Sequence, residues 1–195
     1  MTTVRNIARD VQSFTSNAFL VDGERTVLVD AGSGFDAVGR VESATGGLDA
    51  VLLTHTHPDH VGTVESVVEA FDVEVWGFDP DHELVDNALS DGGTVRAGDE
   101  SYAVLYTPGH KDDHVCFLSD EAGTLFAGDL IFANGGYGRT DLEEGDHAAL
   151  VDSIEYLHSA VDGSLSTMYT GHGPTVDADP KHHIEVALRA ARMSA

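Results

Sequence analysis

The sequence predicts a layered α/β fold in which helices pack outside two β-sheets. Short apolar runs rich in Val, Leu and Phe alternate along the chain with turns that contain Gly, Asp and Pro. Helical patterns lie between several of these runs. The first half is rich in strands and then mixed, and the second half repeats that order, which favours two sheets.

Eight segments are predicted to be strands because each is short, mainly apolar and bounded by turn residues. In chain order they are residues 17–21, 26–30, 50–54, 73–76, 102–106, 114–118, 124–127 and 165–170. The run AVLLT at 50–54 is expected to be a buried strand.

Four segments between the strands are predicted to be helices. Residues 63–71 place apolar side chains at helical spacing, and residues 82–89 form a shorter candidate. Residues 147–161 repeat apolar side chains at steps of three and four. Residues 181–192 do the same after Pro180, which is typical of a helix start.

Length and composition predict one domain that spans residues 1–195. Hydrophobic residues make up 42% of the chain, enough for a folded core. No apolar run approaches the ~20 residues of a membrane span, and the N-terminus lacks the pattern of a signal peptide. The single cysteine, Cys116, cannot form an internal disulfide, so we expect a cytoplasmic protein.

The chain is strongly acidic, with 10 Lys and Arg against 34 Asp and Glu, and its formal charge is −24. This charge repels polyanions, so nucleic acids and anionic membranes are not expected partners. Repulsion between like charges destabilises a compact chain at low salt and is screened within about 3 Å at about 1 M salt. We therefore predict a halophilic host with a salty cytoplasm.

A cluster of potential metal ligands follows the strand predicted at 50–54. Three histidines and an aspartate fall within six residues, at His55, His57, Asp59 and His60. Imidazole and carboxylate groups together suit zinc or iron. His55 and His57 alternate in an extended segment, whereas Asp59 and His60 turn toward another point. One loop is thereby expected to serve two neighbouring metals.

Three more candidate ligands follow predicted strands in the second half. They are His110 in TPGH, Asp129 in AGDL and His172 in GHGP. Each has glycine close by, which lets the backbone approach a ligand closely. Functional loops often lie at strand ends in α/β proteins.

The complete pattern, H-x-H-x-D-H followed by His, Asp and His, resembles that of the metallo-β-lactamase superfamily. Within it the chain is similar to the glyoxalase II-like (hydroxyacylglutathione hydrolase-like) hydrolases, from Asp30 to Pro174. The resemblance implies an αβ/βα sandwich, two mixed β-sheets flanked by helices. It also implies two Zn²⁺ ions per chain. One would be held by His55, His57 and His110, the second by Asp59, His60 and His172, with Asp129 bridging them.

The resemblance also implies how such a centre works. Two metals about 3.5–4 Å apart share a water and lower its pKa, so a bridging hydroxide attacks a carbonyl carbon. Asp129 and Asp59 are the expected catalytic carboxylates, since Asp129 holds the metals together and Asp59 can orient the hydroxide. Asp30 matches an acidic residue that supports the metal loop, or it is a turn residue at a strand end.

Several other residues near the motifs have expected roles. His114 matches a second histidine of the family motif T-P-G-H-T-x-G-H, and we interpret it as supporting rather than ligating. This chain has Lys111 and Asp113 in place of the usual Thr and Gly. Cys116, inside an apolar run, is predicted to belong to the core. The histidines with no motif support are expected on the surface or on helices: His82, His147, His158, His182 and His183.

Arg139 and Tyr137 are the candidate substrate-binding residues. Arg139 lies in GRTD, a stretch shared by glyoxalase II-like proteins and persulfide dioxygenases. It would bind a substrate carboxylate, brace the loop of Asp129, or pair structurally with an aspartate. Tyr137 beside it would line the pocket.

The leading functional prediction is a zinc-dependent hydrolase of a small thioester or ester. Only about twenty residues follow Gly173, so the helical extension that grips the thiol carrier in full-length glyoxalase II is expected to be absent. Three alternatives stay open: a persulfide dioxygenase with one Fe²⁺ at His55, His57 and either Asp129 or His110, an RNase Z-like nuclease, and a metal-binding protein without activity. The expected partner is a small molecule, and a homodimer is open.

Overall fold

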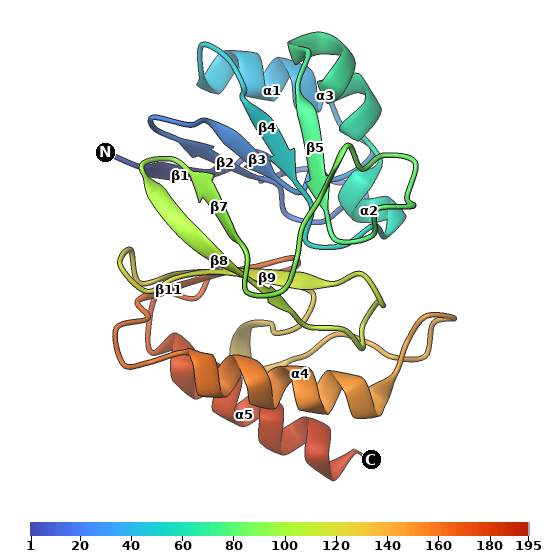
Figure 1. Ribbon diagram of the computed structural model, residues 1–195, viewed down its shortest axis with the longest axis vertical. Helices are drawn as coiled ribbons and strands as arrows, with labels where there is room; N and C mark the ends of the chain where they lie inside the picture. The colour runs from blue at the N-terminus through green and yellow to red at the C-terminus, as the bar shows by residue number, and fades with distance from the viewer. Residues whose placement is uncertain (195) are drawn as a thin grey trace. The chain divides into compact units, whose positions relative to one another are not determined.

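The computed structural model describes residues 1–194 and contains two mixed β-sheets with helices packed on them (Figure 1). The chain forms two compact units. The first unit comprises residues 1–89 and 95–101, and the second comprises residues 90–94 and those from 102 onward. The predicted fold class is thus confirmed, and a single domain over 1–195 stays a prediction.

The first unit is built on a six-stranded sheet with strand order β1-β2-β3-β4-β5-β6. β1–β2 and β2–β3 are antiparallel, and the pairs from β3 to β6 are parallel. The central strands β3 and β4 are buried throughout, as continuous apolar runs predict. The strands are β1 (Thr3–Asn6), β2 (Phe19–Asp22), β3 (Val27–Val29), β4 (Ala50–Leu52), β5 (Glu74–Gly77) and β6 (Asn87–Ala88).

Two helices, α1 (Ala37–Ala44) and α3 (Val64–Phe71), lie on the same side of this sheet (Figure 1). They bury Val41, Val64 and Val67 in one apolar cluster with side chains of the central strands. The short helix α2 (Pro58–Val61) begins directly after His57, and its proline occupies the first turn, where the missing N–H costs nothing.

The second sheet has strand order β11-β10-β9-β8-β7. β8–β9 and β9–β10 are antiparallel, and β10 pairs with β11 in parallel. The strands are β7 (Thr94–Ala97), β8 (Glu100–Tyr106), β9 (Val115–Ser119), β10 (Thr124–Gly128) and β11 (Thr167–Thr170). The division between the two units falls within β7 and close to the start of β8.

In the second unit, helices α4 (His147–Ala160) and α5 (Pro180–Met193) lie side by side, with the short 3₁₀ helix η1 (Ala133–Gly135) beside α5 (Figure 1). Their inner faces bury Ile154, Leu157 and Ile184 together with apolar side chains of β9 and β10. Among residues 1–194, no helix is long and apolar enough to cross a membrane.

All eight predicted strands are present, with ends shifted by up to a few residues. The helix predicted at 82–89 is wrong: this segment holds turns and β6. The Asp86 N–H donates to the Val75 carbonyl, and the Asp86 carboxylate accepts from the Val75 N–H, so the segment pairs with the edge of β5. Val85 packs closely against Gly77, because a Cβ added to Gly77 would lie only 2.6 Å from Val85 Cγ2.

Candidate metal centre

In the first unit, the loop after β4 is anchored by Asp30, which follows β3. The Asp30 side chain is buried, and its Oδ1 accepts a hydrogen bond of 2.8 Å from the Thr54 N–H. Its Oδ2 accepts from the Thr54 hydroxyl at 2.7 Å and from His60 Nδ1 at 2.8 Å. The interpretation of Asp30 as a support of this loop is therefore confirmed, and it is more than a turn residue.

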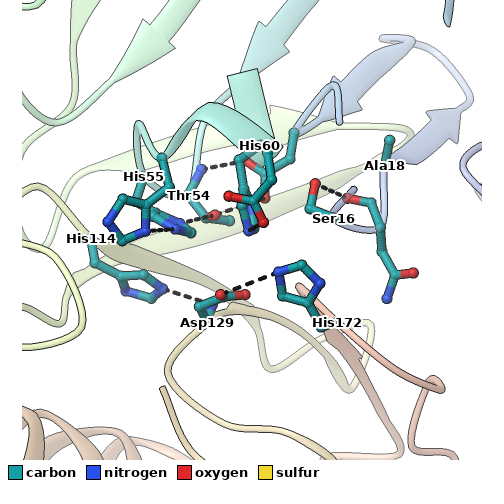
Figure 2. A network of polar contacts seen from close by, with 12 residues as sticks. Ser16, Ala18, Thr54, His55, His60, His114, Asp129 and His172 are labelled. Atoms are coloured by element: carbon teal, nitrogen blue, oxygen red, sulfur yellow. Dashed lines mark hydrogen bonds and ion pairs between the residues drawn. The ribbon is translucent and has the colours of Figure 1, made fainter. Parts of the chain in front are cut away.

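These contacts fix the protonation of two histidines (Figure 2). A carboxylate only accepts, so His60 Nδ1 carries a proton, and in the neutral ring Nε2 carries the lone pair. The Thr54 hydroxyl gives its proton to Asp30, so it accepts from His55 Nδ1 at 3.1 Å. In the neutral ring of His55, Nε2 therefore carries the lone pair as well, and it lies 3.1 Å from His57 Nδ1.

Asp59 and His60 lie on α2, one after the other. Asp59 Oδ2 lies 4.0 Å from His60 Nε2. The His60 ring also packs against that of His55, with ring centroids 4.0 Å apart. The loop thus brings together the four residues that the sequence singled out there.

In the second unit, the loop of His110 is held by α4. The Ser153 hydroxyl donates to the Pro108 carbonyl at 2.7 Å, and the Asp146 N–H donates to the Gly109 carbonyl at 2.8 Å. Gly109 has φ +128°, and a Cβ there would lie 2.2 Å from the main-chain nitrogen of Leu150. Only glycine fits this close approach.

His110 and His172 both point to Asp129 within the second unit. His110 Nδ1 donates to the Arg139 carbonyl at 2.8 Å, so in the neutral ring Nε2 carries the lone pair. Asp129 Oδ2 lies 3.4 Å from His110 Nε2. It lies 3.5 Å from His172 Nε2, and Figure 2 shows the contact between these two side chains. Gly138 passes so close that a Cβ would stand 2.2 Å from the Asp129 carbonyl oxygen.

These distances fit metal ligands better than hydrogen bonds. Two nitrogen or oxygen ligands, each about 2.1 Å from a tetrahedral zinc, lie about 3.4 Å from each other. Asp129 and its two histidines have this spacing within the second unit. The Nδ1–H groups of His60 and His110 are held by a carboxylate and a carbonyl, the usual arrangement behind a ligating imidazole. The residues present therefore fit divalent metals.

His114 and Cys116 behave as the sequence predicts. His114 is completely buried, and its nitrogens contact Thr107 Oγ1 at 2.8 Å and the Asp129 N–H at 3.1 Å, so it supports the ligand loops. Burial raises the pKa of the Cys116 thiol from 9.0 to about 12, although a hydrogen bond with Thr107 lowers it somewhat. At neutral pH this thiol is neutral and enclosed in the core.

Arg139 and Tyr137 each contact a neighbouring group. Arg139 is exposed and forms a two-pronged ion pair with Asp141, with both N–O distances 2.7 Å. This pair holds the pKa of Asp141 at about 2. The Tyr137 hydroxyl donates to Ser194 Oγ at 3.0 Å. Their role in substrate binding stays a prediction.

The loop around Lys111 differs from the family motif, and Lys111 forms ion pairs with the carboxylates around it. Lys111 Nζ lies 3.1 Å from Asp112, 3.7 Å from Asp113 and 3.8 Å from Glu144. These carboxylates raise the pKa of Lys111, although its partial burial lowers it. Asp113, buried where the family usually has glycine, is therefore paired in part by Lys111.

Most histidines without motif support have structural contacts. His147 Nε2 donates to the Ala191 carbonyl at 3.0 Å, and His158 lies 3.7 Å from Glu185. His82 and His183 accept from the main-chain N–H groups of Leu84 and Asn134. None of these contacts involves a candidate ligand.

Sequence reasoning missed three buried threonines, each at or just after the end of a strand and each followed by a ligand loop. Thr54 contacts Asp30 and His55, and Thr107 contacts His114. The Thr170 hydroxyl donates to the carbonyls of His172 at 2.8 Å and of Pro174 at 3.2 Å. The signal was present in the sequence, because a threonine stands one to three residues before the histidine of each loop.

Comparison with known proteins gives named relatives. A hydroxyacylglutathione hydrolase of Francisella tularensis subsp. novicida is 36% identical over 127 residues, 64% of this chain and 49% of that protein. The chain thus spans about half the length of this relative. The hydroxyacylglutathione hydrolase GloC of Haemophilus influenzae is 28% identical over 188 residues, 84% of this chain and 88% of that protein.

Solved structures share the fold. ETHE1 from Myxococcus xanthus has a TM-score of 0.77 and 25% identity, over 98% of this chain and 90% of that one. TTHA1623, solved in a di-iron-bound form, has a TM-score of 0.72 and 32% identity, over 90% and 92%. The family model of the metallo-beta-lactamase superfamily matches residues 12–172 of this chain. With its ligand motifs in place in both units, the chain belongs to the metallo-β-lactamase superfamily.

Proposed function

We propose that this protein is a dinuclear metal-dependent hydrolase of a small thioester or ester. The observation that carries the proposal is the placement of one oxygen of Asp129 at 3.4 and 3.5 Å from two imidazole nitrogens, as a bridging carboxylate requires. Similarity to hydroxyacylglutathione hydrolases, over most of the length of the Haemophilus protein, supports acyl transfer to water as the reaction.

The proposed ligand sets are those that the resemblance implies. One metal would be held by His55, His57 and His110 and the other by Asp59, His60 and His172, and Asp129 would be shared between them. Bound metals of this kind supply a hydroxide near neutral pH and a Lewis acid for the carbonyl oxygen.

The chain itself keeps the ligands in place. Asp30 holds the Nδ1–H of His60, and the Arg139 carbonyl holds that of His110, so both imidazoles offer Nε2 without a change of tautomer. The carboxylate of Asp59, 4.0 Å from His60 Nε2, would orient the hydroxide. Burial keeps Cys116 a neutral core residue, so it is not assigned as a nucleophile.

A second candidate is a persulfide dioxygenase that uses one iron. The similarity to ETHE1 and the GRTD stretch around Arg139 favour it. The residues of the second ligand set, Asp59, His60 and His172, are all present and weigh against it.

The first test is elemental analysis of protein purified in high salt without added metal, followed by assays with thioesters, esters and lactones. Two zinc ions per chain together with thioester or ester hydrolysis are the expected result. One iron per chain with oxygen uptake on a persulfide would favour the second candidate instead.

Asp129→Ala tests the ligand assignment. Loss of the shared carboxylate should abolish dinuclear binding and turnover together, because both metals lose a ligand. Asp120→Ala is the matched control, since Asp120 is an exposed carboxylate in the turn after β9 of the same unit. If Asp129→Ala kept two metals and full turnover, the assignment would be wrong.

A further inference from the structure

We propose that His114 is a positioning residue that sets the metal affinity of Asp129 through its main chain, and that Thr107 fixes the required tautomer of His114. The inference rests on the proposed role of Asp129 as a metal ligand. It concerns a histidine that is not itself in the ligand sets.

The hydrogen bonds of His114 define its tautomer. The main-chain N–H of Asp129 points at His114 Nε2 with a distance of 3.1 Å (Figure 2). An N–H group only donates, so Nε2 accepts through its lone pair. The proton of the neutral ring is then on Nδ1, which donates to Thr107 Oγ1 at 2.8 Å.

The surroundings of the Thr107 hydroxyl favour its accepting the proton of His114 Nδ1. Its hydroxyl lies 3.5 Å from the Leu105 carbonyl and 3.4 Å from Cys116 Sγ, two groups that can accept its own hydrogen. The hydrogen bonds therefore run in one direction, from Asp129 to His114, to Thr107 and to the end of β8. All three side chains are fully buried or nearly so, so water does not compete for these bonds.

Asp129 needs such support because the regular ladder stops just before it. The pairing of β10 with β11 shifts register between Phe126 and Gly128, and Gly128 has a φ of +49°. Directly after this irregularity, the main chain of Asp129 is bound by a side chain instead of by the neighbouring strand. If His114 carried its proton on Nε2, two N–H groups would face each other, and the Asp129 backbone would have to move.

Two substitutions of His114 separate positioning from filling of space. The amide of a glutamine reaches the place of Nε2, where its oxygen can accept from Asp129, whereas the shorter asparagine reaches only the place of Nδ1. His114→Asn should lower Zn²⁺ affinity about 10–100-fold, the usual effect of losing an outer partner of a ligand. His114→Gln should retain most of the affinity.

Thr107 provides an independent test. Thr107→Val removes the hydroxyl that accepts the Nδ1 proton of His114 at nearly constant shape, whereas Thr107→Ser retains this hydroxyl. We expect the valine variant to lose Zn²⁺ affinity and the serine variant to keep it. Zn²⁺ affinity is measured by competition with a chromophoric chelator, the ligand field by Co²⁺ absorption, and the His114 tautomer by ¹⁵N NMR of the metal-free protein.

Several outcomes would overturn the proposal. One is an Nε2–H tautomer of His114 in the wild-type protein. This measurement does not depend on the folding of any variant. Another is a loss of Zn²⁺ affinity that is equal in His114→Gln and His114→Asn and that follows their loss of melting temperature. His114 would then act only by packing in the core. Wild-type protein that binds Zn²⁺ but hydrolyses no ester or thioester would refute the proposed function and leave this inference standing. Failure to bind any divalent metal would refute both.

Discussion

At the scale of single residues, Asp30 shows how one buried carboxylate organises a ligand loop. It accepts three hydrogen bonds, two from Thr54 and one from His60. Asp30→Asn would put an amide in place of a carboxylate oxygen, and an N–H would then face the Thr54 hydroxyl or His60. We expect Zn²⁺ affinity to fall about 10–100-fold, as measured by chelator competition.

Asp72→Asn is the matched control for this change. Asp72 is exposed at the end of α3, and its φ of +54° equals that of Asp30. The two substitutions are therefore alike in backbone strain and differ in contacts. Equal metal affinity in Asp30→Asn and Asp72→Asn would refute the anchoring role.

Cys116 links stability to pH. Because burial raises its pKa from 9.0 to about 12, the unfolded chain loses the thiol proton above pH 9 while the folded chain keeps it. The folded state then binds more protons, so stability falls as pH rises in this window. Between about pH 9 and about pH 11 the wild-type free energy of unfolding should lose about 1.4 kcal/mol per pH unit relative to Cys116→Ala.

Denaturant unfolding of both proteins at each pH checks this slope, and taking their difference removes the contribution of tyrosines and lysines common to both. A difference that stays constant with pH would show that the thiol ionises as easily in the folded chain as in the unfolded one.

At the scale of elements, α4 connects helix capping to the His110 loop. The Asp146 carboxylate caps α4 by accepting from the Ala149 N–H at 3.0 Å, and the Asp146 N–H binds the Gly109 carbonyl. Asp146→Ala should lower the free energy of unfolding by about 1 kcal/mol. It should also weaken Zn²⁺ binding, because the start of α4 supports the loop that carries His110.

Asp36→Ala is the comparison, since Asp36 caps α1 in the same way by accepting from the Gly39 N–H at 2.9 Å. It should cost similar stability and leave Zn²⁺ affinity unchanged. Thermal melts and chelator competition measure the two quantities. The support by α4 would be refuted if both variants bound Zn²⁺ as the wild type does.

The elements also show where sequence patterns suffice and where they fail. Two of the strands that are followed by candidate ligands, β4 and β10, were predictable because they are nearly continuous buried apolar runs. The helix expected at 82–89 failed because its pattern competes with pairing to β5. Edge strand β1 and helix α1 were not predicted because each buries few side chains. Helix α1 also contains Gly39, which is unfavourable inside a helix.

At the scale of the whole molecule, the charge of −24 predicts a response to salt. Repulsion among carboxylates acts over about 10 Å at about 0.1 M salt and only about 3 Å at about 1 M. The melting temperature should therefore rise with KCl over this range, as followed by circular dichroism. A melting temperature that does not rise would contradict adaptation to a salty cytoplasm.

The sequence by itself determined the family, most of the sheet-forming segments and the identity of the candidate ligands. It could do so because apolar runs specify strands locally and because the ligand types are chemically restricted to histidine and aspartate. Only the tertiary structure decided how these ligands are held. The hydrogen bonds that fix the tautomers of His60, His110 and His114 join residues 15 to 30 positions apart, and no local pattern encodes such pairings.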